Sequence, residues 1–311
     1  MTIGIAAFGE GAARAVREGV RAAEVIGRGD VGGFAVLSVL DRAGHHRQVS
    51  CQRGGVRALG PCAGMEEARV AAIISSGPDR PEPLGQFLVG AGQVGLVTGH
   101  RLPNRAGPDG VPLNRAVLDR MARGVPVAEA VGAVMAAAPE ADAGLIAVAA
   151  GGAVAWANSE RVARRRDLGH ASEIAEGRGF ALLCNSLHAP PGVEVAEVVS
   201  QVIAARLMGR EGRYALAPVA GGVPVTGGGA DRVVLGARGE VAEVTVAEPR
   251  PATGTRPVTV IASGAPVWER GRRVGVVLSD VDARIAEGRI GLDGGAEEAM
   301  VWCRDPGGDA R

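Results

Sequence analysis

The sequence predicts a layered α/β fold, in which helices cover one face of antiparallel sheets. Three observations support this prediction. Two successive blocks each read strand, helix, strand, strand; the last two strands of each block form a hairpin; and the first predicted helix is apolar along a single face. Helices packed on hairpins indicate layers rather than a doubly wound parallel sheet.

The first block covers the N-terminal part of the chain. An apolar strand at 3–8 is followed, through a Gly-Glu-Gly turn, by a helix over 12–26 with alanine and valine at helical spacing. The glycine-rich segment after residue 26 ends this helix. The segments GFAVLSVL and RQVSCQ, joined by DRAGHH, form a hairpin. We expect a helix over 64–75 and a Pro/Gly-rich connector over 77–92.

The second block repeats this order of elements. It is predicted to contain a strand at 93–98, helices at 111–123 and 126–138, and strands at 143–149 and 153–158.

The pattern changes after Arg166. We expect a strand at 179–186, a helix at 193–208, short strands within 214–248 and 257–279, and a helix that Ser279 caps at its N-terminus. The sequence therefore predicts one domain over 1–170 and a mixed α/β region over 171–311, which completes the first domain or forms a lid or oligomerisation lobe.

Composition excludes several classes of function. The formal net charge is +0 and aromatic residues make up 3%, so neither nucleic acid nor an anionic membrane is an expected partner. The chain has no lysine, which excludes a P-loop lysine, a Schiff-base lysine and a Ser–Lys dyad. The N-terminus does not resemble a signal peptide, and no apolar run is long enough to span a bilayer.

The four cysteines form no C-x-x-C pair. We therefore expect reduced thiols in a cytoplasmic protein, with no metal and no cofactor.

Polar residues gather at two strand ends between Gly92 and Arg165. Thr98-Gly99-His100 ends one apolar strand, and Asn158-Ser159-Glu160 ends another. Polar groups at the ends of buried strands are held on a rigid support, so we expect the two clusters to converge if the strands share a sheet.

The order of these motifs resembles the β-subunit of plant-type asparaginases and isoaspartyl peptidases. The matching pieces are TGH, the segment VLDRMARGVPVAEAVGAV, GLIAV and NSE. These proteins are N-terminal-nucleophile hydrolases, so the resemblance implies an αββα sandwich over 1–170. It also implies that Thr98 and Gly99 bind the substrate and its oxyanion, for which a hydroxyl and a glycine N–H are suitable donors.

The nucleophile of that family is a threonine that opens a strand before TGH, yet no threonine lies between Gln52 and Thr98. The first substitute is Thr2. Removal of Met1 would free an α-amine beside the Thr2 hydroxyl, which supplies both nucleophile and base. The alternative is an ordinary start codon before an ordinary first strand.

Three further residues are alternative nucleophiles. Thr255 follows Gly254 in a segment that reads as a loop. Cys51 lies at a strand end near Arg53, which would lower a thiol pKa, although a buried structural cysteine is the simpler interpretation. Cys184 would be the nucleophile of a cysteine hydrolase.

Several polar residues are candidates for the rest of the site. His100 would act as a general acid or base, or bind its own loop. Arg101 and Arg53 would clamp a carboxylate, unless they are ordinary surface arginines. Asn104 and Asn158 complete the predicted substrate-binding set, although Asn158 fits a turn equally well.

These residues predict an amide-bond hydrolase for a small, carboxylate-bearing substrate. The alternative is a non-catalytic, ligand-binding or structural protein that lacks the nucleophile. In either case we expect a homo-oligomer.

Overall fold

The computed structural model describes residues 1–27, 30–247, 256–292 and 297–305. The chain folds as two compact units, Met1–Arg210 and Glu211–Arg311, which we call unit 1 and unit 2.

Unit 1 contains an antiparallel six-stranded sheet with the order β3-β2-β4-β1-β10-β9. Its strands are β1 (Thr2–Phe8), β2 (Ala35–Leu40), β3 (His46–Cys51), β4 (Val70–Ser76), β9 (Leu168–Ala175) and β10 (Arg178–Asn185). β1 is a central strand, although it begins at the second residue of the chain.

A second antiparallel sheet in unit 1 has the order β5-β6-β7-β8. Its strands are β5 (Val89–Ala91), β6 (Gly95–Arg101), β7 (Ala143–Ala149) and β8 (Ala153–Asn158). The helices of unit 1 are α1 (Ala12–Ile26), α2 (Gly55–Ala58), α3 (Leu113–Ala122), α4 (Val127–Ala137), α5 (Glu160–Ala163) and α6 (Val195–Met208), with a 3₁₀ turn η1 (Leu84–Phe87).

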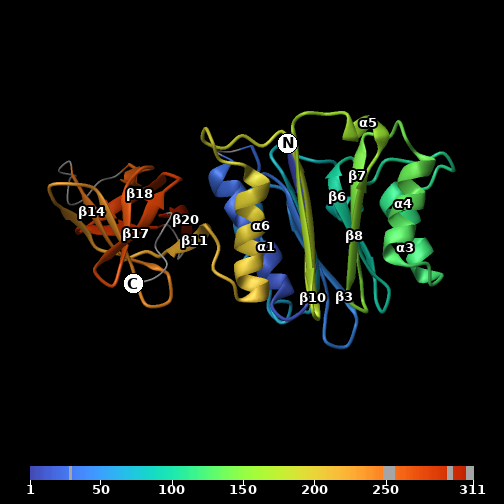
Figure 1. Cartoon of the computed structure of the whole chain (residues 1–311), viewed down its shortest axis with the longest axis horizontal. Coiled ribbons are helices and arrows are strands. Elements are labelled where there is room, and N and C mark those ends of the chain that lie inside the picture. The colour runs from blue at the N-terminus through green and yellow to red at the C-terminus, as the bar shows by residue number, and fades with distance from the viewer. Residues whose placement is uncertain (28–29, 248–255, 293–296, 306–311) are drawn as a thin grey trace. The chain divides into compact units, whose positions relative to one another are not determined.

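The two sheets of unit 1 face each other, with α1 and α6 outside the first sheet and α3 and α4 outside the second (Figure 1). Side chains along β1 point alternately to the two faces of the first sheet. Ala6 and Phe8 join the apolar core between the sheets, whereas Ile5 packs on the helix side. β1 and β6 approach so closely that a Cβ at Gly4 would collide with the carbonyl oxygen of Gly99.

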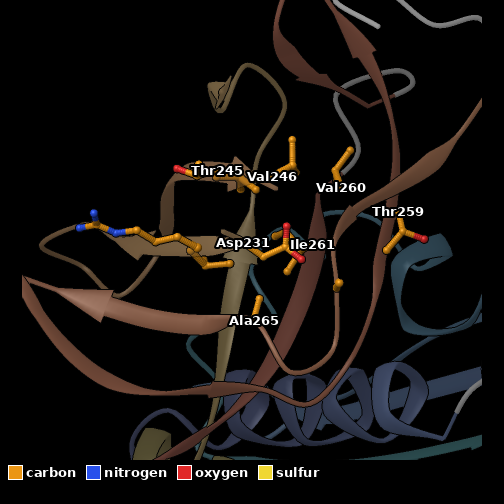
Figure 2. Close-up of a pocket in the computed structure, with 11 residues that line it drawn as sticks. Asp231, Thr245, Val246, Thr259, Val260, Ile261 and Ala265 are labelled. Carbon is orange, nitrogen blue, oxygen red and sulfur yellow. The ribbon is translucent and has the colours of Figure 1, made fainter. Parts of the chain in front are cut away.

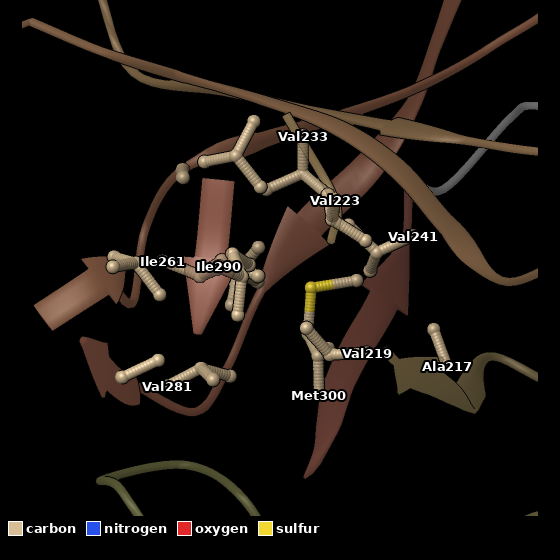
Figure 3. Packing of buried hydrophobic residues seen from close by; sticks show 14 of the residues in the cluster. Ala217, Val219, Val223, Val233, Val241, Ile261, Val281, Ile290 and Met300 are labelled. Carbon is tan, nitrogen blue, oxygen red and sulfur yellow. The ribbon is translucent and has the colours of Figure 1, made fainter. Parts of the chain in front are cut away.

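Unit 2 is built from strands in the residues that the structure describes. Its strands are β11 (Tyr214–Val219), β12 (Val225–Gly227), β13 (Arg232–Leu235), β14 (Val241–Val246), β15 (Val258–Ile261), β16 (Pro266–Glu269), β17 (Arg272–Val277), β18 (Val281–Ala286), β19 (Arg289–Gly291) and β20 (Glu298–Arg304). They form a seven-stranded sheet, β11-β20-β17-β16-β13-β14-β12, and a three-stranded sheet, β15-β18-β19. Valine and isoleucine side chains surround Met300 in the core (Figure 3).

The predicted fold class, an αββα sandwich with a mixed α/β C-terminal region, is wrong for this chain. Strands hold about 40% of the residues and helices about 21%, and the strands form four sheets. The largest error lies at Ser279, which was expected to cap a helix. Residues 281–286 form β18 instead, because Val281, Ala283 and Ile285 alternate toward the core with a period of two.

One other expectation within unit 1 needs correction. Residues 70–76, mostly assigned to a helix over 64–75, form β4, because a short apolar run does not distinguish a buried strand from a buried helix. Unit 1 extends to Arg210, and β10 pairs with β1 inside its first sheet.

Candidate functional site

Three polar residues form a row across the first sheet of unit 1. Thr2 at the start of β1 lies opposite Ser76 of β4 on one side and Asn185 of β10 on the other. Directly opposed residues share a face of a sheet, and Gly4, two residues after Thr2, faces β6. The row Ser76–Thr2–Asn185 is therefore directed at the second sheet.

A second row lies across the sheet that faces it. His100 of β6 is opposite Gly144 of β7, and Gly144 is opposite Asn158 of β8. His100 Nε2 is 2.8 Å from Asn158 Oδ1, and a Cβ at Gly144 would collide with both side chains. Glycine thus provides the space that the His100–Asn158 pair occupies. The predicted convergence of the two clusters is confirmed for His100 and Asn158, through the shared sheet.

The two rows are held together across the sheet interface. Thr98, two residues before His100, donates its hydroxyl to the carbonyl of Ile73 in β4 at 3.4 Å. Asn185 is near enough to His100 to favour its charged form. His100 Nδ1 and Asn185 Oδ1 are both buried without a hydrogen-bond partner.

His100 is neutral at physiological pH. Burial is the main cause that lowers its pKa from 6.5 to about 4, and the nearby Arg101 lowers it further; the side chains of Asn158 and Asn185 oppose this shift. An imidazole that stays uncharged can accept a proton or a hydrogen bond, but it cannot provide a positive charge.

Two of the predicted carboxylate clamps already hold carboxylates of the protein. Arg101 forms a bidentate pair with Asp142, in which Nη2 lies 2.7 Å from Oδ2. Arg53 forms an exposed pair with Asp79 at 2.7 Å. Neither guanidinium is free to bind a carboxylate ligand unless its own ion pair breaks.

A third arginine lies at the first row. Arg80 Nη2 donates to Ser76 Oγ at 2.9 Å, and Gln52 holds the Arg80 backbone through its side-chain amide. Burial lowers the pKa of Arg80, and no carboxylate pairs with it among the described residues. Arg80 therefore has guanidinium donors available beside Thr2.

Thr2 is buried at the start of β1. The residue is only 2% exposed, and its Oγ1 lies 3.5 Å from Ser76 Oγ. Ser76 Oγ donates to the Met1 carbonyl at 2.7 Å. Burial, followed by the charges of Arg80 and Arg101, lowers the pKa of the Met1 amine.

The structure gives the remaining predicted residues other contacts. A Cβ at Gly99 would collide with the Gly144 carbonyl, so that position needs glycine for packing. Asn104 donates to Gln86 of η1 at 2.7 Å, which ties its loop to η1. Thr255 lies outside the described residues.

Neither predicted cysteine nucleophile is activated. Burial raises the pKa of Cys184 to about 12. Burial also raises the pKa of Cys51, whose Sγ donates to the Gly55 carbonyl at 3.1 Å. Both thiols are protonated at neutral pH, which removes the thiolate that a nucleophile requires.

Sequence reasoning missed Ser76 and Arg80 because β4 was expected to be a helix. The signal was present: AAIISSGPDR ends an apolar run with polar residues, as Thr98-Gly99-His100 does. The rule applied to Thr98 would have found Ser76 once 70–76 was recognised as a strand.

Outside the two rows, the described part of unit 2 contains a small cavity. In unit 2 a cavity of about 10 Å³ lies between Asp231, Thr245, Thr259 and apolar neighbours, which is room for about one water (Figure 2). The described residues contain no group of three His, Cys, Asp or Glu side chains able to hold a metal ion. None of the helices in the described part of the chain has the length and apolarity needed to cross a membrane.

Comparison with known proteins agrees with the two units. The family described as Domain of unknown function (DUF6963) matches residues 2–215, and the family described as Domain of unknown function (DUF7259) matches residues 222–298. No curated protein matches the chain. Because the first match covers more than half of the 311 residues, the chain belongs to the DUF6963 family.

Proposed function

We propose that this protein is an amide-bond hydrolase in which Thr2, freed by removal of Met1, is the nucleophile. The observation that carries the proposal is the position of Thr2. It is the first residue of the central strand β1 and lies between Ser76 and Asn185. Thr2 Oγ1 lies 3.5 Å from Ser76 Oγ, so two hydroxyls meet at the start of β1.

The chemistry requires only groups of this chain and water. The α-amine of Thr2 takes the hydroxyl proton while Oγ1 attacks the amide carbonyl carbon. The C–N bond then breaks, the amine leaves with that proton, and an ester remains on Thr2. Water hydrolyses the ester and restores the hydroxyl.

Ser76 and Arg80 are the best supported groups for binding the carbonyl oxygen. In the present chain the Met1 carbonyl stands in for a substrate carbonyl, and Ser76 Oγ donates to it at 2.7 Å. Arg80 donates to the same hydroxyl at 2.9 Å, which strengthens Ser76 as a donor. We therefore assign the oxyanion role to Ser76, in place of Thr98, whose hydroxyl already binds Ile73.

Arg80 is also placed to bind a carboxylate group of the substrate. Its remaining guanidinium N–H groups have no carboxylate partner in the described residues, in contrast to those of Arg53 and Arg101. A guanidinium presents a planar pair of donors that matches a carboxylate. We thus assign substrate-carboxylate binding to Arg80.

One observation favours the alternative, a ligand-binding or structural protein without catalysis. With Met1 in place, Thr2 is buried and the position next to Ser76 is filled by the Met1 carbonyl. A mature protein that keeps Met1 would have neither a free Thr2 amine nor an accessible hydroxyl.

Two measurements test the proposal. Intact mass of the protein purified from cells establishes whether Met1 is removed, and we expect the mass of a chain that begins at Thr2. Hydrolysis of a panel of small amides that carry a carboxylate is then followed by amine release. Thr2→Ala keeps a small residue after Met1 and removes the hydroxyl together with the γ-methyl group, so we expect a loss of at least a hundredfold in activity.

Thr2→Ser should retain activity, because it keeps a hydroxyl beside the amine. Thr226→Ala, in β12 of unit 2, is the matched control and should behave as the unaltered protein. Full activity in Thr2→Ala, or retained Met1 in an active protein, would show that the nucleophile assignment is wrong.

A further inference from the structure

β9 is an exposed sheet edge in unit 1. It ends the strand order of the first sheet and pairs only with β10 within the described residues. It is eight residues long, its register has no bulge, and it contains neither proline nor lysine. A long and regular edge strand is a template for another strand unless something blocks it.

The edges of the two sheets in unit 1 differ in how they are protected. β3 carries His46, Arg47 and Gln48, and the Gln48 amide donates to the Leu88 carbonyl next to η1. β5 is only three residues long. These are usual ways of protecting an edge. β8 and β9 lack both, and β9 is the longer of the two, with eight residues against six.

The turn after β9 determines which backbone groups point outward. Ala175 and Arg178 are paired across a two-residue turn, so they form a hydrogen-bonded pair. The same alternation continues to the other end of the strand, where Ser186 N donates to the Asp167 carbonyl at 2.9 Å. Odd-numbered residues of β9 therefore bond to β10, and the even-numbered ones direct N–H and C=O to the open edge.

The side chains of the even-numbered residues form an apolar and aromatic patch. Ile174 is 65% exposed, the most exposed large apolar residue in the described part of the chain. On the same face, the rings of His170 and Trp156 lie 4.7 Å apart, and Trp156 Nε1 donates to Ser172 Oγ at 3.3 Å. We call Trp156, His170, Ser172 and Ile174 the β9 patch.

We propose that β9 of a second copy of this chain pairs antiparallel with this edge, about a two-fold axis at Ser172. In this register Ile174 lies opposite His170 of the partner subunit and covers the ring pair there. Such a contact is self-complementary, as a two-fold interface requires. The β9 edge of each subunit is thus covered by the β9 strand of the other.

Charge also favours this register. Glu173 is bound to Arg210 within its own chain at 2.5 Å, and it lies opposite Ala171 of the partner subunit. A pairing centred on Glu173 would instead place two carboxylates opposite each other, which is unfavourable. The proposal concerns assembly alone and does not depend on the hydrolase proposed above.

The mass of the intact full-length protein in solution, measured by light scattering after size exclusion, tests the interface. We expect a dimer for the unaltered chain and a monomer for Ile174→Lys, because lysine on an edge strand opposes pairing. Ser50→Lys, at an exposed position of the other edge strand β3, is the matched control and should remain dimeric. A monomeric unaltered chain, or a dimeric Ile174→Lys, would overturn the proposal.

Cysteine cross-linking tests the register. Ser172→Cys should form an intermolecular disulfide under mild oxidation, because residues paired across the axis have a Cα separation of about 5.5 Å. Ala171→Cys should not, because it lies opposite a different residue. The unaltered chain, with its four free cysteines, is oxidised in parallel as the control. A disulfide in Ala171→Cys but not in Ser172→Cys would overturn the register.

Discussion

The two polar rows of unit 1 face each other, yet they have different chemical capacities. The row on the first sheet combines two hydroxyls, Thr2 and Ser76, with the unpaired guanidinium of Arg80. The row on the second sheet joins a neutral imidazole, His100, to the Asn158 amide. The first row lies beside the N-terminal residue, because Ser76 Oγ donates to the Met1 carbonyl, whereas His100 and Asn158 bond to each other.

The difference lies in the partners that each polar residue at a strand end has. Thr98 and Thr2 are both buried threonines, but the Thr98 hydroxyl binds a backbone carbonyl and Thr2 lies next to a terminus. Arg101 and Arg80 differ in the same way, because only Arg101 has a carboxylate beside it in the described structure. The first row is therefore the reactive one in our proposal.

Among the variants that compare the two rows, the largest effect should come from Arg80, which lies beside the first row. We expect Arg80→Gln to raise the KM for a carboxylate-bearing substrate by roughly thirtyfold or more, since losing one partner of a close charge pair typically costs about 2–5 kcal/mol. Steady-state kinetics measure this change.

Arg53→Gln is the matched control for that variant. It removes an exposed guanidinium already paired with Asp79, so KM should change less than threefold. Equal effects of the two substitutions would contradict the distinction between the arginines.

The second row should determine part of the acid stability. The pKa of His100 is about 4 in the folded state and about 6.5 when unfolded, so the unfolded chain binds more protons between these values. The stability due to the neutral ring is complete above pH 6.5 and is lost as the pH falls toward 4. We expect a decrease of about 3 kcal/mol over this range from this one group.

Urea unfolding at pH 4.5 and pH 7.5 measures that dependence. His100→Gln should lower stability at both pH values but weaken the pH dependence, because the variant lacks the titrating ring. His45→Gln, on an exposed turn, serves as the control and should keep the full dependence. An unchanged pH dependence in His100→Gln would contradict the assignment.

The smallest effect concerns the contact that holds the rows together. Gly4→Ala places a Cβ against the Gly99 carbonyl, so the sheets must separate locally. We expect a loss of about 1–3 kcal/mol in the free energy of unfolding, as for an overpacked core. Chemical denaturation measures it.

Gly132→Ala is the opposite case and the control. Gly132 lies in α4 with open space around its Cβ position, so alanine should stabilise the helix by about 0.5–1 kcal/mol. If Gly4→Ala were also neutral or stabilising, the close approach of β1 and β6 would not be needed for stability.

Local patterns were sufficient for elements with clear periodicity. The helix at 12–26 and the strands at 143–149 and 153–158 are confirmed at the predicted bounds, because their apolar spacing and flanking turns are contained in the segment itself. β4, β9 and β18 were missed or assigned to helices. In β4, burial on both faces removes the alternation that identifies a strand.

The candidate site could be predicted only in part. His100 and Asn158 were identified from their places at strand ends, and β7 brings them together. Ser76 and Arg80 were not identified, because their relevance depends on β4 lying beside β1, a pairing 74 residues apart at Thr2 and Ser76. No local pattern contains such a pairing.

The sequence by itself determined which segments carry polar residues at strand ends, that lysine chemistry is excluded, and where the clearest helices and hairpins lie. These depend on spacing and residue type alone. Only the tertiary structure decided that β1 is central, that Arg53 and Arg101 are neutralised by carboxylates, and that Arg80 is not. The physical reason is that strand pairing and ion pairing join residues far apart in the chain, so the capacity of each group depends on neighbours that only folding supplies.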